Sequence, residues 1–356
     1  MDSMDQTTNQ WPDRPWIDSP NFDDELERRS GALTGLQRQV AIDLHRQGFA
    51  VVEGLVSDQL CGQVRQEIEP LFDEEYARRE RRVPDAWDRD APAVRQVALL
   101  PEILDCLAAV YGRRPIPFQT LNFKWGSEQG YHSDAIHFTS APDRFLCGVW
   151  VALEDVDDGN GPLTYYPGSH RVPQFRSFEP GSDPDRYAEF EATQCGVMDR
   201  LGVAPLDLHA KRGDALIWSA HLLHGGRPIR RLGSTRWSQV THYYFEGCLY
   251  YQPVYSDFLT GELKLMHIRD LTTLEPAVPS FGDLTVVTTP VGDGRHRVGL
   301  VDAEGTEVAG DAARIDRLES ALRAAESERD ALRDSASFRL GQRVVGPLDR
   351  LRGSNH

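Results

Sequence analysis

The first third of the chain carries apolar side chains at helical spacing. In LQRQVAIDLHRQG, Leu36, Val40 and Leu44 recur every four residues, and Gly48 follows as a typical helix end. The next run, FAVVEGLV, has the apolar density of a short strand. SDQLCGQVRQEIEPLF then opens on Ser57, a favoured N-cap residue, and its apolar residues are again three or four apart. The pattern predicts helices in the N-terminal part.

From about residue 116 to residue 251 the apolar runs become short and are separated by Gly, Pro, Asp and Asn. They include PFQTLNFKW, FLCGVWVAL, LTYYPG, DALIWS and RWSQVTHYYF. Many short strands with turn signals and no intervening helical periods are typical of a sandwich or barrel. We therefore expect a mainly β fold, a double-stranded β-helix (jelly roll, cupin-like), with helices N-terminal to it.

These changes predict four segments. Residues 1–30 are rich in Asp, Pro, Asn and Gln and are expected to form a loose arm. Residues 31–251 form the main domain, and residues 252–308 form a small β-rich extension. Residues 309–356 are expected to form a C-terminal helix.

The expected C-terminal helix has a heptad seam. Its apolar residues are three, four or seven positions apart, and the seam is only about three heptads long. A helix this short is marginal alone, so a coiled coil would need a partner helix. A homo-oligomer formed through this helix is therefore possible. The seam consists of Ile315, Leu318, Leu322, Ala325 and Leu332.

Charge narrows the possible partners. The 39 basic and 55 acidic residues give a net charge of −16, which disfavours nucleic acid and anionic membrane surfaces. The N-terminus lacks the basic start and apolar run of a secretory signal, and no run approaches the roughly 18 apolar residues of a membrane span. We expect a cytoplasmic protein without a transmembrane segment.

The five cysteines of the chain are scattered and form no Cys-x-x-Cys motif, which predicts that they are reduced packing residues.

The stretch EQGYHSDAIHF holds the first candidate metal ligands. If it is a strand, His132 and Asp134 point the same way, about 6 to 7 Å apart, and both can reach one ion. A third ligand is needed, and GDALIWSAHLLHGG offers His221 or His224, which chemistry alone does not separate. Two imidazoles and one carboxylate form the facial triad of non-haem iron oxygenases, with positions open for a co-substrate and dioxygen.

A lone His-x-Asp is more often a hydrogen-bonded pair than a metal site, so further signals matter. If the co-substrate is 2-oxoglutarate, its distal carboxylate needs a cationic fork. Arg236 follows His224 by twelve residues on an alternating strand, and Ser238 shares its face. His137 would lie on the opposite face from His132, in a structural or substrate-side role. Polar or packing roles are expected for His170, His209 and His242.

With these motifs in order, the chain resembles the phytanoyl-CoA dioxygenase family of Fe(II)/2-oxoglutarate oxygenases from about Arg38 to about Phe245. WVALEDVDDGNGPLTYYPGSH is the most specific part of the likeness. The resemblance implies His224, rather than His221, as the third ligand beside His132 and Asp134. It also implies further co-substrate contacts. These are the clamp Arg236, with Trp150, Thr120, Asn122 and Lys124.

The resemblance implies an Fe(II)/2-oxoglutarate-dependent dioxygenase that hydroxylates a small-molecule or glycan-linked substrate and releases succinate and CO2. Asp134 favours hydroxylation over halogenation, because halogenating relatives carry a small residue there. Ser133 and Gly226 depart from the Gln and Ser of many members. Desaturation and epimerisation stay open, as does a catalytically silent cupin-like scaffold that binds a metal or a sugar. Candidates for the pocket rim are Tyr131, His137, Phe138, Tyr165 and Arg171.

Overall fold

The computed structural model describes residues 13–172, 184–257 and 260–306, and it divides the chain into two compact units, Met1–Val298 and Gly299–His356. Apart from residues 299–306, which include the end of the last strand, everything described below lies in the first unit. The predicted C-terminal helix, residues 309–356, lies outside the described residues.

Both helices predicted in the N-terminal part are confirmed, as α2 (Gly35–Gln47) and α3 (Asp58–Ile68). Thr34 and Gln37 form a capping box at the start of α2, and Gly48 ends it in the left-handed region at φ 83°. Ser57 caps α3 by accepting from the Leu60 N–H. Leu36 is exposed, so the buried face of α2 begins at Val40.

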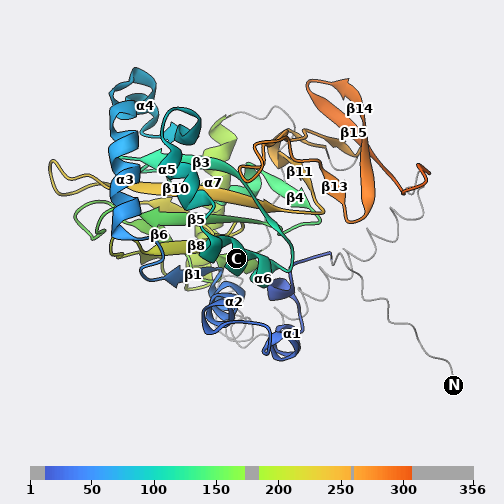
Figure 1. The fold of residues 1–356 in the computed structure, drawn as a ribbon, viewed down its shortest axis with the longest axis horizontal. Helices are drawn as coiled ribbons and strands as arrows, with labels where there is room; N and C mark the ends of the chain where they lie inside the picture. Colours follow the sequence, from blue (N-terminus) through green and yellow to red (C-terminus); the bar gives the residue numbers. More distant parts are fainter. Residues whose placement is uncertain (1–12, 173–183, 258–259, 307–356) are drawn as a thin grey trace, which may run out of the picture. The chain divides into compact units, whose positions relative to one another are not determined.

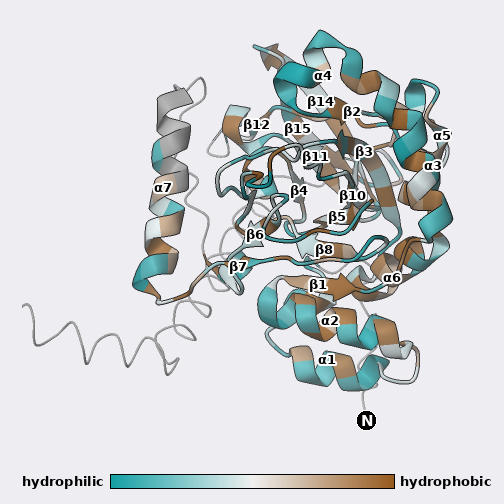
Figure 2. Cartoon of the chain, turned by 90° about the vertical axis from the view of Figure 1, so that its left-hand side faces the viewer, coloured by the Kyte–Doolittle hydropathy of each residue, from teal (hydrophilic) through white to brown (hydrophobic). Residues whose placement is uncertain are grey.

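Further helices surround these two. Within the expected loose arm, residues 13–30 form η1 (Trp16–Asp18) and α1 (Phe22–Arg29). Trp16 and Phe22 are buried there and stack on each other. Figure 2 shows the mixed hydrophilic and hydrophobic colouring of α1 and α2 that is typical of amphipathic helices. The remaining N-terminal helices are α4 (Glu75–Glu80), α5 (Pro92–Ala98) and α6 (Pro101–Tyr111).

The centre of the fold is a six-stranded antiparallel sheet (Figure 1). Its order is β1-β8-β5-β10-β3-β2, so strands far apart in the sequence are neighbours. Every residue of β5 and β10 is buried, because α3, α5 and α6 contribute to the apolar core on one face and a second sheet covers the other. The strands are β1 (Phe49–Val52), β2 (Val83–Pro84), β3 (Pro115–Phe123), β5 (Leu146–Ala152), β8 (Ala215–Ser219) and β10 (Ser238–Phe245).

The second sheet has the order β7-β6-β9, with β6 (Leu163–Tyr165) between β7 (Leu206–Asp207) and β9 (His224–Gly226). Apolar residues of both sheets form one buried cluster, in which Tyr165 of the small sheet lies 4.2 Å from Phe49 of the large sheet between ring centroids. A two-stranded sheet of β4 (Thr139–Ala141) and β11 (Leu249–Tyr251) completes the main domain. The prediction of a mainly β fold is confirmed, and the pairs of strands in these three sheets are antiparallel.

The expected absence of helix between residues 116 and 251 is wrong. Helix α7 (Pro184–Arg200) lies between β6 and β7, with Pro184 as its first residue and Gly202 just beyond it at φ 71°. Gln194 and Met198, four residues apart, are both buried. The helix lies in the connection between two short strands, and the strand pattern on either side of it gave no sign of a helix.

Residues 252–306 contain a four-stranded sheet of order β12-β15-β14-β13. Its long hairpin turns at Asp293 and Gly294, both at positive φ. No helix among the described residues is long and apolar enough to cross a membrane. The strands are β12 (Glu262–Leu263), β13 (Ser280–Phe281), β14 (Leu284–Gly292) and β15 (Arg295–Val301).

Candidate metal centre

Three buried side chains, His132, Asp134 and His224, converge at one end of the gap between the two sheets. His132 and His224 form an isolated antiparallel bridge in which each backbone N–H donates to the other residue's carbonyl at 2.9 Å. This pairing places the two imidazoles side by side, with ring centroids 4.5 Å apart. The two histidines, 92 positions apart in the chain, are therefore held by the backbone itself.

Asp134 reaches the same point through a turn. The expected strand through EQGYHSDAIHF is wrong, because only His132 pairs and Asp134 begins the 3-10 helix η4 (Asp134–Ile136). The Ala135 N–H donates to the Ala220 carbonyl at 3.0 Å, and the His137 N–H donates to the Asp134 carbonyl at 2.9 Å. These bonds curl the chain after Ser133, so the closeness of His132 and Asp134 comes from a turn and not from strand alternation.

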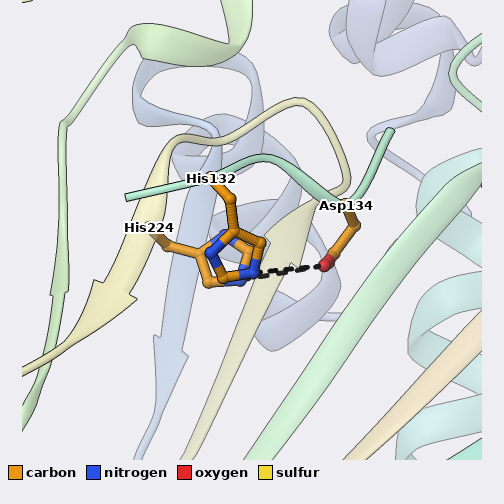
Figure 3. Close-up of side chains that lie close together, drawn as sticks. All are labelled: His132, Asp134 and His224. Atoms are coloured by element: carbon orange, nitrogen blue, oxygen red, sulfur yellow. Dashed lines mark ion pairs between the residues drawn. The ribbon is translucent and has the colours of Figure 1, made fainter. Parts of the chain in front are cut away.

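Figure 3 shows the three side chains pointing toward one another. Asp134 Oδ1 lies 4.0 Å from His132 Nε2 and 3.9 Å from His224 Nε2, and one ligand atom from each residue falls within 4.8 Å of the others. The set is compact and buried, and it offers two nitrogens and one oxygen. This is a donor combination that suits a non-haem iron site.

The far nitrogens of both imidazoles are already engaged. His132 Nδ1 lies 2.9 Å from the Gly130 carbonyl, and His224 Nδ1 lies 3.0 Å from the Leu222 carbonyl. A carbonyl oxygen only accepts, so the proton of a neutral ring sits on Nδ1 in each case. Both Nε2 lone pairs are then directed at the space beside Asp134, as a metal ligand requires.

The charges of the site match this assignment. Burial, followed by repulsion from His224, lowers the pKa of His132 to about 3, so its imidazole is neutral at physiological pH. Burial alone would raise the pKa of the Asp134 carboxyl, but attraction to His224, His242 and His132 outweighs it and holds that pKa well below its usual range. The site therefore presents a neutral His132 imidazole and an ionised Asp134 carboxylate.

The second oxygen of Asp134 is held by two side chains that the sequence analysis did not place here. Trp218 Nε1 donates to Oδ2 at 2.7 Å, and His242 Nε2 lies 3.5 Å from the same oxygen. His242 was expected to be a polar or packing residue. Because strand residues two apart share a face, the alternation that groups Arg236 with Ser238 extends through Val240 to His242 and would have revealed it.

A cavity of about 60 Å³ begins at these residues and reaches Arg236 at its other end. Arg236 Nη1 donates to Ser238 Oγ at 3.0 Å, and the guanidinium lies 5.7 Å from the Trp150 ring and 5.8 Å from the Phe123 ring. A Cβ at Gly126 would lie 2.6 Å from Arg236 Nη2, so a glycine at position 126 leaves room for the guanidinium where it lies. The lining residues are Arg82, Leu121, Phe123, Ser127, Gln129, His132, Asp134, Trp150, Leu163, Trp218, His224, Gly225, Arg236, Val240 and His242.

Arg236 is a buried cation with an unused donor. Burial lowers its pKa to about 10, which leaves it charged at neutral pH. Its Nε has no hydrogen-bond partner among the described residues. A buried guanidinium with spare donors is suited to an incoming carboxylate, which is what a 2-oxoglutarate site needs.

Three other predicted co-substrate contacts face away from the cavity. Thr120 bonds to Asp85, Asn122 bonds to the Val83 carbonyl, and Lys124 pairs with Glu69 at 3.1 Å. The cavity is lined instead by Leu121 and Phe123, the residues of opposite parity on the same strand. The wrong face of β3 was therefore chosen for Thr120 and Asn122, and the same error extends to Lys124, which directly follows the strand.

The remaining candidates are placed around the cavity or outside it. His221 Nε2 lies 3.6 Å from Asp143 and borders a separate small cavity. His137 lies 6.1 Å from His132 between ring centroids, and Phe138 packs edge-on against His242. The expected opposite face for His137 is wrong, because no strand forms there.

Three rim candidates and two of the remaining histidines contact other parts of the fold. Tyr131 bonds to Thr164 at 2.9 Å, Tyr165 packs in the core, and Arg171 bonds to the His45 carbonyl. His170 also contacts the His45 carbonyl, and His209 pairs with Asp158. None of the five rim candidates lines the cavity.

Comparisons with known proteins agree with these features. Residues 44–236 match the family model described as phytanoyl-CoA dioxygenase (PhyH). The peroxisomal phytanoyl-CoA dioxygenase of Bos taurus is 25% identical over 208 residues, which are 50% of this chain and 60% of the bovine protein. The ectoine dioxygenase of Bordetella parapertussis is 27% identical over 207 residues, 51% of this chain and 66% of that protein.

A solved structure supports the fold. The non-haem alpha-ketoglutarate-dependent carbocyclase SnoK from nogalamycin biosynthesis superposes with a TM-score of 0.51 at 18% identity, covering 71% of this chain and 95% of that chain. The family match spans more than half of the 356 residues and includes His132, Asp134, His224 and Arg236. The chain therefore belongs to the phytanoyl-CoA dioxygenase family.

Proposed function

We propose that this protein is an Fe(II)- and 2-oxoglutarate-dependent dioxygenase that hydroxylates a small-molecule or glycan-linked substrate. In the proposed reaction, substrate R–H, dioxygen and 2-oxoglutarate give R–OH, succinate and CO2, with one oxygen atom entering each of the first two products. The observation that carries the proposal is a single cavity with a buried His-Asp-His set at one end and a buried arginine at the other. The two facing antiparallel sheets support a double-stranded β-helix as the finer description of the fold.

The residues present fit an iron ion. His132 and His224 would supply Nε2, because a backbone carbonyl holds each Nδ1, and Asp134 would supply Oδ1, because Trp218 and His242 hold Oδ2. When bound, Fe(II) supplies the redox chemistry that couples oxidation of 2-oxoglutarate to activation of dioxygen.

The other end of the cavity would hold the co-substrate. Arg236 and the Ser238 hydroxyl lie 3.0 Å apart and can both donate to the distal carboxylate of 2-oxoglutarate. Trp150, Phe123 and Leu163 line the same cavity with apolar side chains, which would limit the access of water to the reacting region. The geometry would orient the co-substrate with its other end toward His132, Asp134 and His224.

The test combines binding with turnover. Purified protein is mixed anaerobically with Fe(II) and 2-oxoglutarate, and a metal-to-ligand absorption band is sought in the green region of the spectrum. Exposure to dioxygen is then expected to release succinate slowly, even without substrate. His224→Ala should lose both signals because it removes one of three ligands. A wild-type protein that gave neither the band nor succinate would instead indicate a silent scaffold.

A further inference from the structure

A second arginine lines the same cavity. Arg82 follows α4 and immediately precedes β2, whose Val83 pairs with Asn122 of β3. Continuing this register by one residue places Arg82 opposite Phe123, another lining residue. Arg82 therefore enters the cavity from the edge strand, whereas Arg236 enters from the segment just before β10.

The preceding residue explains the direction of Arg82. Arg81 has a left-handed backbone at φ 59°, which is uncommon for a residue with a side chain. Its guanidinium donates to the Gly126 and Trp125 carbonyls and pairs with Glu128 at 2.9 Å. Arg81 thus attaches the segment to the loop that leads to His132, and its charge is compensated.

The charge of Arg82 has no such compensation. Among the residues that the structure describes, Arg82 forms no hydrogen bond and no ion pair. Among the described lining residues, Asp134 is the only carboxylate, and it already contacts Trp218, His242 and the two imidazoles. A half-buried guanidinium without an anionic partner loses part of its hydration and gains no ion pair in exchange. Such a group therefore favours the binding of an anionic ligand.

A charge count shows which ligand is missing. The ionised lining residues are Arg82, Arg236 and Asp134, which sum to 1 + 1 − 1 = +1. Fe(II) adds two positive charges and 2-oxoglutarate adds two negative ones, so the sum stays at +1 in the loaded site. The distal carboxylate of the co-substrate is matched by Arg236, which leaves the surplus positive charge at Arg82.

We propose that Arg82 binds an anionic group of the substrate, a carboxylate or another monoanionic oxyacid, and so selects acidic substrates. This inference rests on the proposed function, because the charge count includes the iron and 2-oxoglutarate. It deepens that function by naming a substrate class. In a chain with a net charge of −16, a local cation is also what allows an anion to enter the site.

The experiment loads the site first, so that Arg236 is occupied. The protein is kept anaerobic with Fe(II) and saturating 2-oxoglutarate, and the visible band confirms loading. Matched pairs of probes are then titrated, namely linear and aromatic carboxylic acids of three to eight carbons and their primary amides. Binding is followed by intrinsic tryptophan fluorescence, since Trp150 and Trp218 line the cavity, and by calorimetry.

We expect acids to bind wild-type protein more tightly than the amides do. Arg82→Gln should weaken acid binding at least about tenfold, as expected for a lost charged hydrogen bond, and leave amide binding unchanged. Arg82→Lys should retain part of the preference. The matched control is Arg79→Gln, because Arg79 lies on the preceding helix with a largely exposed side chain that contacts Glu80.

Several outcomes would overturn the inference. Equal binding of acids and amides, no binding of either by loaded wild-type protein, or an acid preference kept by Arg82→Gln would each do so. Weaker 2-oxoglutarate binding in Arg82→Gln would assign Arg82 to the co-substrate instead, while the oxygenase proposal stood. If wild-type protein failed to load at all, the proposed function itself would fail. Thermal melting of each variant checks that it is folded.

Discussion

The two ends of the cavity are built from different kinds of backbone. At the metal end, His132 sits on an isolated bridge, Asp134 on a 3-10 turn and His224 at the first residue of a three-residue strand. At the carboxylate end, Arg236 donates its N–H to the Lys124 carbonyl and leads directly into the eight-residue strand β10. The carboxylate end is fixed by the strand register and by burial, whereas the metal end depends on a few specific hydrogen bonds. We therefore expect the two ends to respond independently to mutation and to metal.

Arg236→Ala is expected to give the largest difference between the two ends, that is, between the loss of 2-oxoglutarate affinity and the loss of iron affinity. Removing the guanidinium should weaken 2-oxoglutarate binding by about 100- to 1000-fold, because a buried charge-assisted contact is lost. Iron affinity should change by less than about threefold, since no ligand atom is touched. Titration of the visible band with each component measures both quantities.

Arg236→Lys serves as the control, because it keeps the charge but loses the planar fork, and intermediate affinity is expected. If Arg236→Ala bound 2-oxoglutarate as wild type does, the clamp would have to lie elsewhere.

Metal removal should affect local opening at the metal end most. Iron at about 100 times its dissociation constant should stabilise the folded state by roughly 2.7 kcal/mol, and a chelator should reverse this. Hydrogen exchange through local opening should then rise in residues 132–136 and 220–226, whereas the buried strand β10 should exchange faster by no more than this loss of global stability allows. Exchange measured by mass spectrometry with and without chelator tests this, and a uniform rise across both ends would contradict the comparison.

The same contrast explains what the sequence could predict. Arg236 and Ser238 were grouped correctly because residues two apart on a strand share a face, and the structure places their side chains 3.0 Å apart. Thr120, Asn122 and Lys124 were grouped by the same rule, but the pattern did not tell which face of β3 meets the cavity. Both faces of that strand are largely buried, so polarity did not mark the difference.

The metal end was predicted through its order of residues and not through its geometry. His132 and Asp134 were expected to meet by strand alternation, whereas a turn brings them together. Trp218 and Arg82 gave no signal, because their roles depend on strand pairing that only the fold reveals. Helix α7 was missed because it lies in a connection between short strands, whose pattern gave no sign of a helix.

A pair of tryptophans sharpens the comparison within the cavity. Trp218→Phe removes the N–H that donates to Asp134 Oδ2 and should weaken iron binding about tenfold, as for other groups that orient metal ligands. The affinity for 2-oxoglutarate in the loaded complex should stay within about twofold of the wild-type value.

Trp150→Phe is the matched control, because Trp150 Nε1 has no partner among the described residues. It should leave iron binding unchanged and, at most, affect 2-oxoglutarate. Equal losses of iron affinity in the two variants would show that the hydrogen bond to Asp134 is unimportant.

The smallest expected effect concerns pH, and it distinguishes a histidine that is only buried from one that is also a proposed metal ligand. Burial lowers the pKa of His170 to about 3, as it does for His132, yet His170 does not line the cavity, and its Nε2 lies 3.2 Å from the His45 carbonyl. Between the unfolded pKa near 6.5 and the folded pKa, the unfolded chain binds more protons, so stability is present above pH 6.5 and is lost as pH falls. Between pH 6.5 and pH 5.5, each of the two histidines should lower the free energy of unfolding by about 1 kcal/mol.

Urea unfolding of wild-type protein and His170→Gln at both pH values, with and without Fe(II) under anaerobic conditions, measures this cost. The variant should lose about 1 kcal/mol less than wild type over this interval, whether or not iron is present. Iron should add stability to both proteins without steepening their pH dependence through His132, because that imidazole is already neutral in the folded protein over this interval. If His170→Gln changed the stabilisation that iron gives, His170 would have to be coupled to the metal end, and the independence of that end from the surrounding fold would be lost.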